Sequence, residues 1–197
     1  ASEVTINYVI TDEVRHIKMV MVDPNSLATI SVNDPELMIN KPAGLTAATG
    51  MDALTHAIES YITAGAFRLS DTLSLEAIKL IGESLETAVK DGKNIEARSK
   101  MAWASYTAGL SFSNAGLGIV HSMAHQLGSE YNLPHGVANA VLLPHVEEFN
   151  MDACGEKFRD IAKALGTCTK DMTTEEANKA AIQAIKDLSA KVGIPKG

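Results

Sequence analysis

The chain has little of what marks several large classes of protein. Its 197 residues include 17 Lys and Arg against 24 Asp and Glu, a formal net charge of −7, and no block of basic residues. Nucleic-acid-binding proteins and proteins that bind anionic membranes present basic surfaces, so we expect neither kind of partner. The longest apolar runs fall far short of the roughly 20 residues that a membrane-spanning helix needs.

Cysteine is also scarce. Cys154 and Cys168 are too few for a disulfide framework, which indicates a reducing compartment. The first residues have neither the basic stretch nor the apolar stretch of a signal peptide. We therefore expect a cytoplasmic protein. Because the chain opens directly in a β-rich stretch and stops just past a helical pattern, we also expect it to be a piece of a longer protein.

Two hydrophobic periods divide the chain. Alternation predicts a β-hairpin from residues 4–11 and 17–22, followed by a third strand at residues 28–32. From Leu45 onward the period changes to about 3.6, which is typical of helices. We therefore expect a mainly α protein, in which a hairpin and a strand within residues 1–40 precede an all-helical unit at 41–197.

The helical part divides at turn signals into seven segments. They are predicted at about 45–63, 70–89, 95–112, 117–131, 135–150, 156–165 and from about 174 onward. Ser70 is an expected N-cap, and Thr173 with Glu176 forms an expected capping box. Glu147 and Glu148 are expected on a solvated helix face.

Histidine placement is the strongest chemical signal in the sequence. Asp52 and His56 are four residues apart, as are His121 and His125, so each pair shares one helical face. His135 stands at a predicted helix start. One carboxylate with three imidazoles, from Asp52, His56, His121 and His135, suits a first-row divalent ion. Four protein ligands leave room for a substrate oxygen, which is typical of a catalytic site.

Other readings of these patterns stay open at this point. Either pair alone is a weak signal, because most histidines on amphipathic helices cap, pack or lie in solvent. His16 is expected in solvent at the hairpin turn, and His145 is expected to pack or to form hydrogen bonds. The Gly116-Leu117-Gly118 segment begins like a dinucleotide fingerprint, but its sixth position is a histidine and no predicted strand precedes it.

Three long segments resemble the iron-containing alcohol dehydrogenases. They are Gly50–Glu59, Gly116–His125 and Pro134–Ala140. The segment Thr5–Glu13 is most similar to the family members that interconvert lactaldehyde and 1,2-propanediol. The resemblance implies a dehydroquinate synthase-like fold, in which residues 1–40 are a remnant of an α/β nucleotide-binding domain. Residues 41–197 would then be the helical metal-binding domain, incomplete at its C-terminal end.

The resemblance also implies roles for individual residues. It assigns the metal to Asp52, His56, His121 and His135, the same four that the spacing proposes. His125 is implied in substrate contact or proton relay. Contacts with the dinucleotide are implied for Thr5, Val9, Lys18 and Leu45, and contacts with the substrate for Asn7 and Phe112.

The activity implied by the resemblance is NAD(H)-linked reduction of a small aldehyde, with lactaldehyde as the expected substrate. Fe(II) is the expected metal, whereas affinity of the ligand set alone favours Zn(II). The ion is expected to polarise the carbonyl oxygen as hydride arrives, with His125 completing proton transfer. The intact enzyme is expected to be a homodimer.

Two alternatives to this function remain. The chain by itself is a helical metal-binding domain without oxidoreductase activity, if most of the dinucleotide site lies outside it. A metal-dependent hydrolase could use the same ligands to activate water. The sequence lacks the His-Asp dipeptide of the helical phosphohydrolases, which counts against the hydrolase.

Overall fold

The computed structural model describes residues 1–196. Within this range the chain is mainly helical, with one two-stranded antiparallel sheet. The helices are α1 (Ala43–Ile62), α2 (Arg68–Lys90), α3 (Ile95–Ala115), α4 (Ile119–Glu130), α5 (His135–Asn150), α6 (Lys157–Ala164) and α7 (Thr174–Lys191). The prediction of a mainly α chain is confirmed, and each helix lies close to its predicted range.

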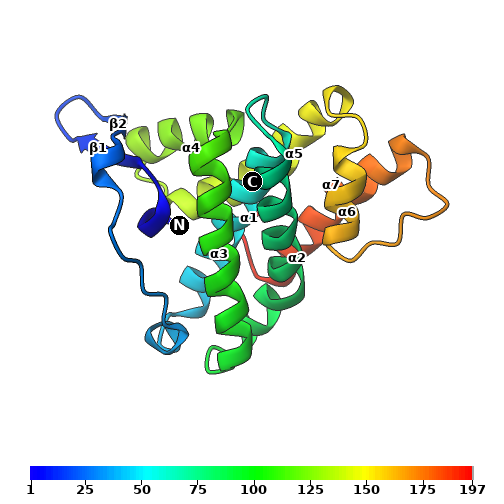
Figure 1. Ribbon diagram of the computed structural model, residues 1–197, viewed down its shortest axis with the longest axis horizontal. Helices are drawn as coiled ribbons and strands as arrows, with labels where there is room; N and C mark the ends of the chain where they lie inside the picture. Colours follow the sequence, from blue (N-terminus) through cyan, green and yellow to red (C-terminus); the bar gives the residue numbers. More distant parts are fainter. Residues whose placement is uncertain (197) are drawn as a thin grey trace.

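Helix α1 is the centre of the packing. It contacts α2, α3 and α5, while α4 lies against α5. Figure 1 shows α1, α2 and α3 in the middle of the molecule, with the hairpin at one end and α6 and α7 at the other. Side chains of α1 and α2 that are fully buried form much of the core: Met51, Leu54, Ile58, Ile78, Ile81 and Leu85. Because α1 is packed in this core, the residues on the face of α1 that points away from the core are held in fixed positions.

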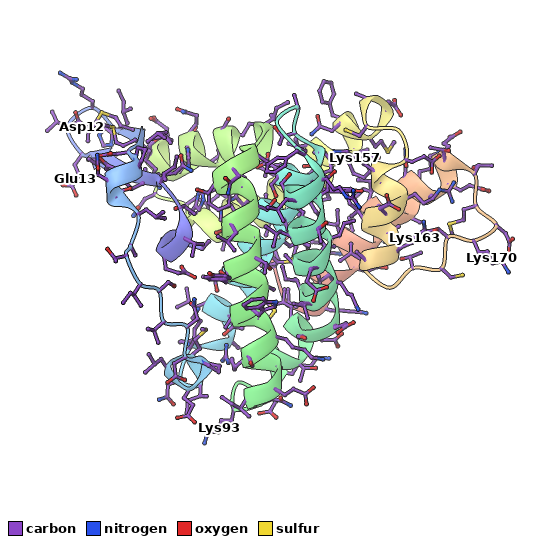
Figure 2. All side chains as sticks on the ribbon, viewed as in Figure 1. Asp12, Glu13, Lys93, Lys157, Lys163 and Lys170 are labelled. Carbon is purple, nitrogen blue, oxygen red and sulfur yellow. The ribbon has the colours of Figure 1, made fainter. Side chains whose placement is uncertain are left out.

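The hairpin consists of β1 (Asn7–Asp12) and β2 (Ile17–Val22). The side chain of Asp12 accepts two backbone N–H bonds of the turn, each 3.0 Å long, and so closes it. Asp12 and Glu13 lie at this end of the molecule in Figure 2. His16 is exposed in the turn, as expected, and has a positive φ of 53°.

The start of the first strand was predicted too early. Ser2–Val4 forms a short 3₁₀ helix, and the strand begins only at Asn7. The N-terminal ammonium donates a hydrogen bond of 3.1 Å to Ser105 Oγ on α3, and Val4 is buried. These contacts hold the first residues on α3 instead of extending them along the hairpin.

The predicted third strand at residues 28–32 is wrong. This segment contains no strand, and the side chains of Ile30 and Val32 are 79% and 82% exposed. A strand requires a neighbouring strand for its backbone hydrogen bonds. In the described sheet, β1 and β2 pair only with one another, so β-branched composition alone does not make this segment a strand.

The predicted N-cap of α2 is wrong, and the predicted capping box of α7 is confirmed. Helix α2 begins at Arg68, before Ser70, whose hydroxyl accepts the Phe67 N–H at 2.8 Å instead of serving as the N-cap. At α7 the capping box is formed: Glu176 N–H donates to Thr173 Oγ1 at 3.2 Å, and Thr173 N–H donates to Glu176 Oε2 at 2.7 Å. Reciprocal bonds of this kind satisfy two free backbone donors.

Glu147 is not on a solvated face, contrary to the prediction. Its side chain is 0% exposed, whereas that of Glu148 is 55% exposed. Glu147 stands four residues after the buried Leu143, so it lies on the inner face of α5. Burial raises the pKa of Glu147 to about 8, against the hydrogen bond from Asn150, and the nearby charge of Glu59 raises it further.

Among residues 1–196, no helix combines the length and the apolar character needed to cross a bilayer. Cys154 and Cys168 are both free thiols. The cytoplasmic location and the absence of a nucleic-acid partner stay predictions.

Replacement of Glu147 by Gln should change how stability depends on pH. The folded chain holds the Glu147 proton up to about pH 8, whereas the unfolded chain releases it near its ordinary pKa of 4.5. The free energy of unfolding should therefore fall between these two pH values, by up to about 1.4 kcal/mol per pH unit. Urea unfolding from pH 5.5 to 8.5 should show a smaller fall for Glu147→Gln than for the parent chain.

The exposed neighbour supplies the control for this experiment. Glu148→Gln should keep the slope of the parent chain. Equal slopes for the parent and for Glu147→Gln would contradict the assignment of a buried, protonated carboxyl.

Candidate metal centre

Three helices bring one carboxylate and three imidazoles together. Asp52 and His56 come from α1, His121 from α4, and His135 is the first residue of α5. Asp52 Oδ1 lies 3.7 Å from His121 Nε2 and 3.5 Å from His135 Nε2. Asp52 Oδ2 lies 3.8 Å from His56 Nδ1. The four residues predicted as metal ligands are therefore grouped around one carboxylate.

The spacing of these atoms fits a divalent cation. Ligand atoms about 2.1 Å from a tetrahedral ion are roughly 3.4 Å apart, close to the separations seen here. Asp52, His56 and His121 each offer an atom within 4.8 Å of the others, whereas His135 is not part of that group, although its Nε2 lies 3.5 Å from Asp52 Oδ1. Within the described part of the chain, the buried His56 Nδ1 has no hydrogen-bond partner. One oxygen and three imidazole nitrogens are a donor set that suits Fe(II) or Zn(II).

Asn139 on α5 contacts three of the four candidate ligands. Its Nδ2 donates to Asp52 Oδ1 at 2.5 Å and lies 3.1 Å from both His121 Nε2 and His135 Nε2. One carboxylate oxygen and two imidazole nitrogens, from three helices, thus surround the Asn139 amide nitrogen.

A glycine lets α5 approach α1 closely enough to form the cluster. A Cβ atom at Gly136 would lie 2.5 Å from the carbonyl oxygen of Ala48 on α1. Because this contact is with a backbone atom, rotation of a side chain could not relieve it. Because Gly136 follows His135 directly, any larger residue would move His135 away from Asp52.

Asp52 and His121 are the two members of the cluster whose charged forms are favoured. Burial alone would raise the pKa of Asp52, but the charges of His56, His121 and His135 hold it well below its usual range. Burial alone would lower the pKa of His121, but the nearby Asp52 carboxylate and the hydrogen bond to Glu59 outweigh burial and raise the pKa to about 9. The carboxylates thus favour positive charge at this point.

The other histidines in and beside the cluster have lowered pKa values, the reverse of the shift at His121. Burial lowers the pKa of His56 to about 3 and that of His125 to about 4, and it also lowers the pKa of His135. The His56 ring lies between Phe112 and His121, with ring centroids 4.4 and 4.5 Å away and interplanar angles of 19°. Neutral imidazoles of this kind have free lone pairs for a metal.

A cavity of about 600 Å³ opens beside the cluster. Its walls come from the N-terminal residues, the hairpin, α1, α3, α4 and the start of α5. It brings together most of the residues for which the sequence predicts a role: Thr5, Asn7, Val9, Asp52, His56, Phe112, His121, His125 and His135. The candidate metal centre therefore forms part of the wall of a cavity large enough for a small organic molecule.

Two predicted cofactor residues lie outside the wall of this cavity. Lys18 is on β2, beside Gly128 of α4, and lines a separate depression. Leu45 is in the first turn of α1 with 51% of its side chain exposed. Their roles toward a dinucleotide stay predictions. His145 was expected to pack or to form hydrogen bonds, and because it is exposed on α5, the expectation that it packs is wrong.

The sequence reasoning missed two residues that touch the candidate ligands. Asn139 contacts three of the ligands, and Glu59 lies 2.5 Å from His121 Nδ1. A signal for each was present. Glu59 is three residues after His56, and Asn139 is four residues after His135, so both share a helical face with a ligand.

Replacement of Asp52 by Asn should lower the pKa of His121. The change keeps the shape of the side chain and removes the negative charge that stabilises the imidazolium, so we expect a fall on the order of one pKa unit or more. NMR titration of the histidine ring signals in EDTA-treated protein measures the shift. Asp152→Asn, at an exposed site in the same chain, should leave it unchanged. An unchanged His121 pKa in Asp52→Asn would show that the Asp52 charge does not stabilise the His121 imidazolium.

Comparison with known proteins gives an independent result. The chain is 53% identical over 196 residues to the 1,3-propanediol dehydrogenase of Citrobacter freundii, covering 100% of this chain and 51% of that protein. It is 52% identical over 195 residues to the lactaldehyde reductase of Escherichia coli, covering 99% and 50% respectively. The chain therefore spans about half the length of these relatives.

Solved structures agree with the sequence comparison. An alcohol dehydrogenase from Oenococcus oeni superposes with a TM-score of 0.96 at 47% identity, over 98% of this chain and 50% of that one. A 1,3-propanediol oxidoreductase gives the same TM-score at 53% identity, over 99% and 51%. Residues 46–197 match the family described as "Fe-containing alcohol dehydrogenase family, C-terminal". With more than half of its length matched, this chain belongs to the iron-containing alcohol dehydrogenase family.

Proposed function

We propose that this chain supplies the metal-binding half of an NAD(H)-linked alcohol dehydrogenase that interconverts lactaldehyde and 1,2-propanediol. The observation that carries the proposal is one carboxylate and three imidazoles in the wall of a cavity of about 600 Å³. The names of the relatives, lactaldehyde reductase and 1,3-propanediol dehydrogenase, support a small alcohol or aldehyde as the substrate.

The residues that would hold the metal are Asp52, His56, His121 and His135. Fe(II) is the ion we propose, with Zn(II) as the alternative that the ligand set also suits. A divalent cation at this position supplies Lewis acidity toward a carbonyl oxygen, and a reduced nicotinamide supplies hydride. The protein contributes the fixed positions of the ligands on three packed helices.

His125 is the proposed proton relay. It lines the cavity one helical turn after His121, and its ring centroid is 5.2 Å from that of His135. Because burial lowers its pKa to about 4, the ring is neutral near pH 7 and offers both an acceptor nitrogen and an N–H donor. A neutral imidazole at the cavity wall can pass a proton to or from a substrate oxygen.

The rest of the cavity wall is proposed to bind and orient the reactants. Phe112 is 8% exposed and stacks on His56, so it forms an apolar wall that excludes water from the ligands. Phe112 and Asn7 are the proposed substrate contacts. Thr5, just before the hairpin, and Val9, on β1, are the proposed dinucleotide contacts within this cavity. Lys18 and Leu45 would contact the dinucleotide from outside it.

The hairpin and the helices are proposed to belong to different domains of the whole enzyme. Residues 1–40 would be part of a nucleotide-binding domain, and residues 41–197 the metal-binding domain. The strands expose Val9, Val20 and Val22 at 46%, 52% and 62%, which leaves an apolar sheet surface and free edges for further packing. We propose a homodimer for the intact enzyme.

A second candidate function applies to the chain by itself. Only two of the four predicted dinucleotide residues line the cavity, and the relatives are about twice as long as the matched segment. In isolation the 197 residues would therefore bind metal without catalysing hydride transfer. Activity measurements on the 197-residue chain and on a full-length chimera that contains it separate the two possibilities.

The test is a chimera in which residues 1–197 replace the matching half of the E. coli lactaldehyde reductase. Iron-loaded chimera is expected to oxidise NADH with lactaldehyde, whereas the 197-residue chain alone is not. His121→Ala in the chimera should lower kcat/KM at least about 100-fold, because loss of a Lewis acid removes several kcal/mol of stabilisation. His145→Ala, at an exposed site, is the control and should keep the parent activity.

Two results would contradict the proposal. The first is a folded, iron-loaded chimera that does not turn over lactaldehyde or another small aldehyde. The second is undiminished activity in His121→Ala.

A further inference from the structure

A buried glutamate lies directly behind one of the candidate ligands. Glu59 is on α1 and is 1% exposed. Its Oε1 accepts the backbone N–H of Val120 at 2.7 Å, and its Oε2 lies 2.5 Å from His121 Nδ1. One carboxylate therefore binds both the first turn of α4 and the imidazole which that turn carries.

The contact with Glu59 determines which nitrogen of His121 keeps a proton. A carboxylate only accepts hydrogen bonds, so the facing Nδ1 remains protonated. The opposite nitrogen, Nε2, faces Asp52 Oδ1 at 3.7 Å and Asn139 Nδ2 at 3.1 Å. It is therefore Nε2 that can give up its proton and present a lone pair to the point where Asp52 and His135 also converge.

The backbone next to α4 leaves room for this carboxylate. A Cβ atom at Gly118 would lie 2.8 Å from Glu59 Oε1. The φ of Gly118 is −138°, a value that any residue adopts. The glycine is thus required by the position of Glu59 and not by the backbone conformation.

We propose that Glu59 is a positioning residue for the metal centre, which holds His121 as the Nδ1–H tautomer so that Nε2 binds the cation. This inference rests on the proposed function, because it takes His121 as a metal ligand. Hydrogen bonds to the outer nitrogen of a ligating histidine fix its orientation, and their loss typically weakens metal binding 10- to 100-fold.

Glu59→Gln is the decisive substitution because it keeps the shape of the side chain and reverses one hydrogen bond. The amide oxygen of Gln must face the Val120 N–H, so its NH₂ group must face His121 Nδ1. An NH₂ group needs an acceptor there, which moves the remaining proton of His121 to Nε2. The imidazole would then present an N–H to the metal instead of a lone pair.

Two other variants separate this effect from a loss of folding. Glu147→Gln is the matched control, since Glu147 is an equally buried carboxyl that bonds Asn150 and not a ligand. Gly118→Ala disturbs Glu59 without changing it, because the new methyl group occupies the position next to Oε1. Circular dichroism and the unfolding midpoint report whether each variant is folded.

The measurement is Co(II) binding by the full 197-residue chain, followed by visible absorption and competition with a chelator. We expect Co(II) affinity 10- to 100-fold weaker in Glu59→Gln, weaker in Gly118→Ala, and unchanged in Glu147→Gln. In the Zn(II)-saturated chain, ¹⁵N–¹H spectra of labelled histidine should show the Nδ1–H signal of His121. That signal is assigned by its loss in His121→Ala, and it should be absent from Glu59→Gln.

Each outcome decides a separate claim. Parent-like Co(II) affinity in Glu59→Gln, with the Nδ1–H signal retained, would overturn the role of Glu59 and leave the metal centre standing. If Glu59→Gln does not fold, parent-like affinity in Gly118→Ala would overturn it. Absence of Co(II) binding by the parent chain would overturn the metal centre itself, and with it this inference.

Discussion

The arrangement of this protein around its candidate site depends on one partly buried negative charge, the Asp52 carboxylate. An isolated buried carboxylate is costly unless positive or hydrogen-bonding groups surround it. Here His121, His135 and the Asn139 amide meet its Oδ1, while His56 faces its Oδ2. These partners come from α1, α4 and α5, so the packing of three helices and the solvation of one charge depend on one another.

The part of the site that could be predicted from the sequence is the part that lies within single helices. A spacing of four residues places Asp52 with His56, and His121 with His125, whatever the rest of the fold does. The change of hydrophobic period near Leu45 likewise predicts where helices replace strands. These features are local, and the structure confirms the helical segments that carry them.

Features that depend on packing between elements were not accessible from the sequence. Glu147 and Glu148 are chemically alike and adjacent, and only the fold of α5 against its neighbours buries one of them. Residues 28–32 have strand composition but lie beside no strand. Glu59 could be placed on the face that bears Asp52, but its contact with His121 requires the position of α4.

The central claim is that one carboxylate and three imidazoles of this chain bind one cation. X-ray absorption spectroscopy at the iron edge of anaerobically Fe(II)-loaded protein tests it most directly, because imidazole rings give a characteristic outer-shell scattering pattern. The account predicts a first shell near 2 Å that contains three imidazoles, reduced to two in His135→Ala. A spectrum without three imidazoles in the parent chain, or the same spectrum in both proteins, would contradict it.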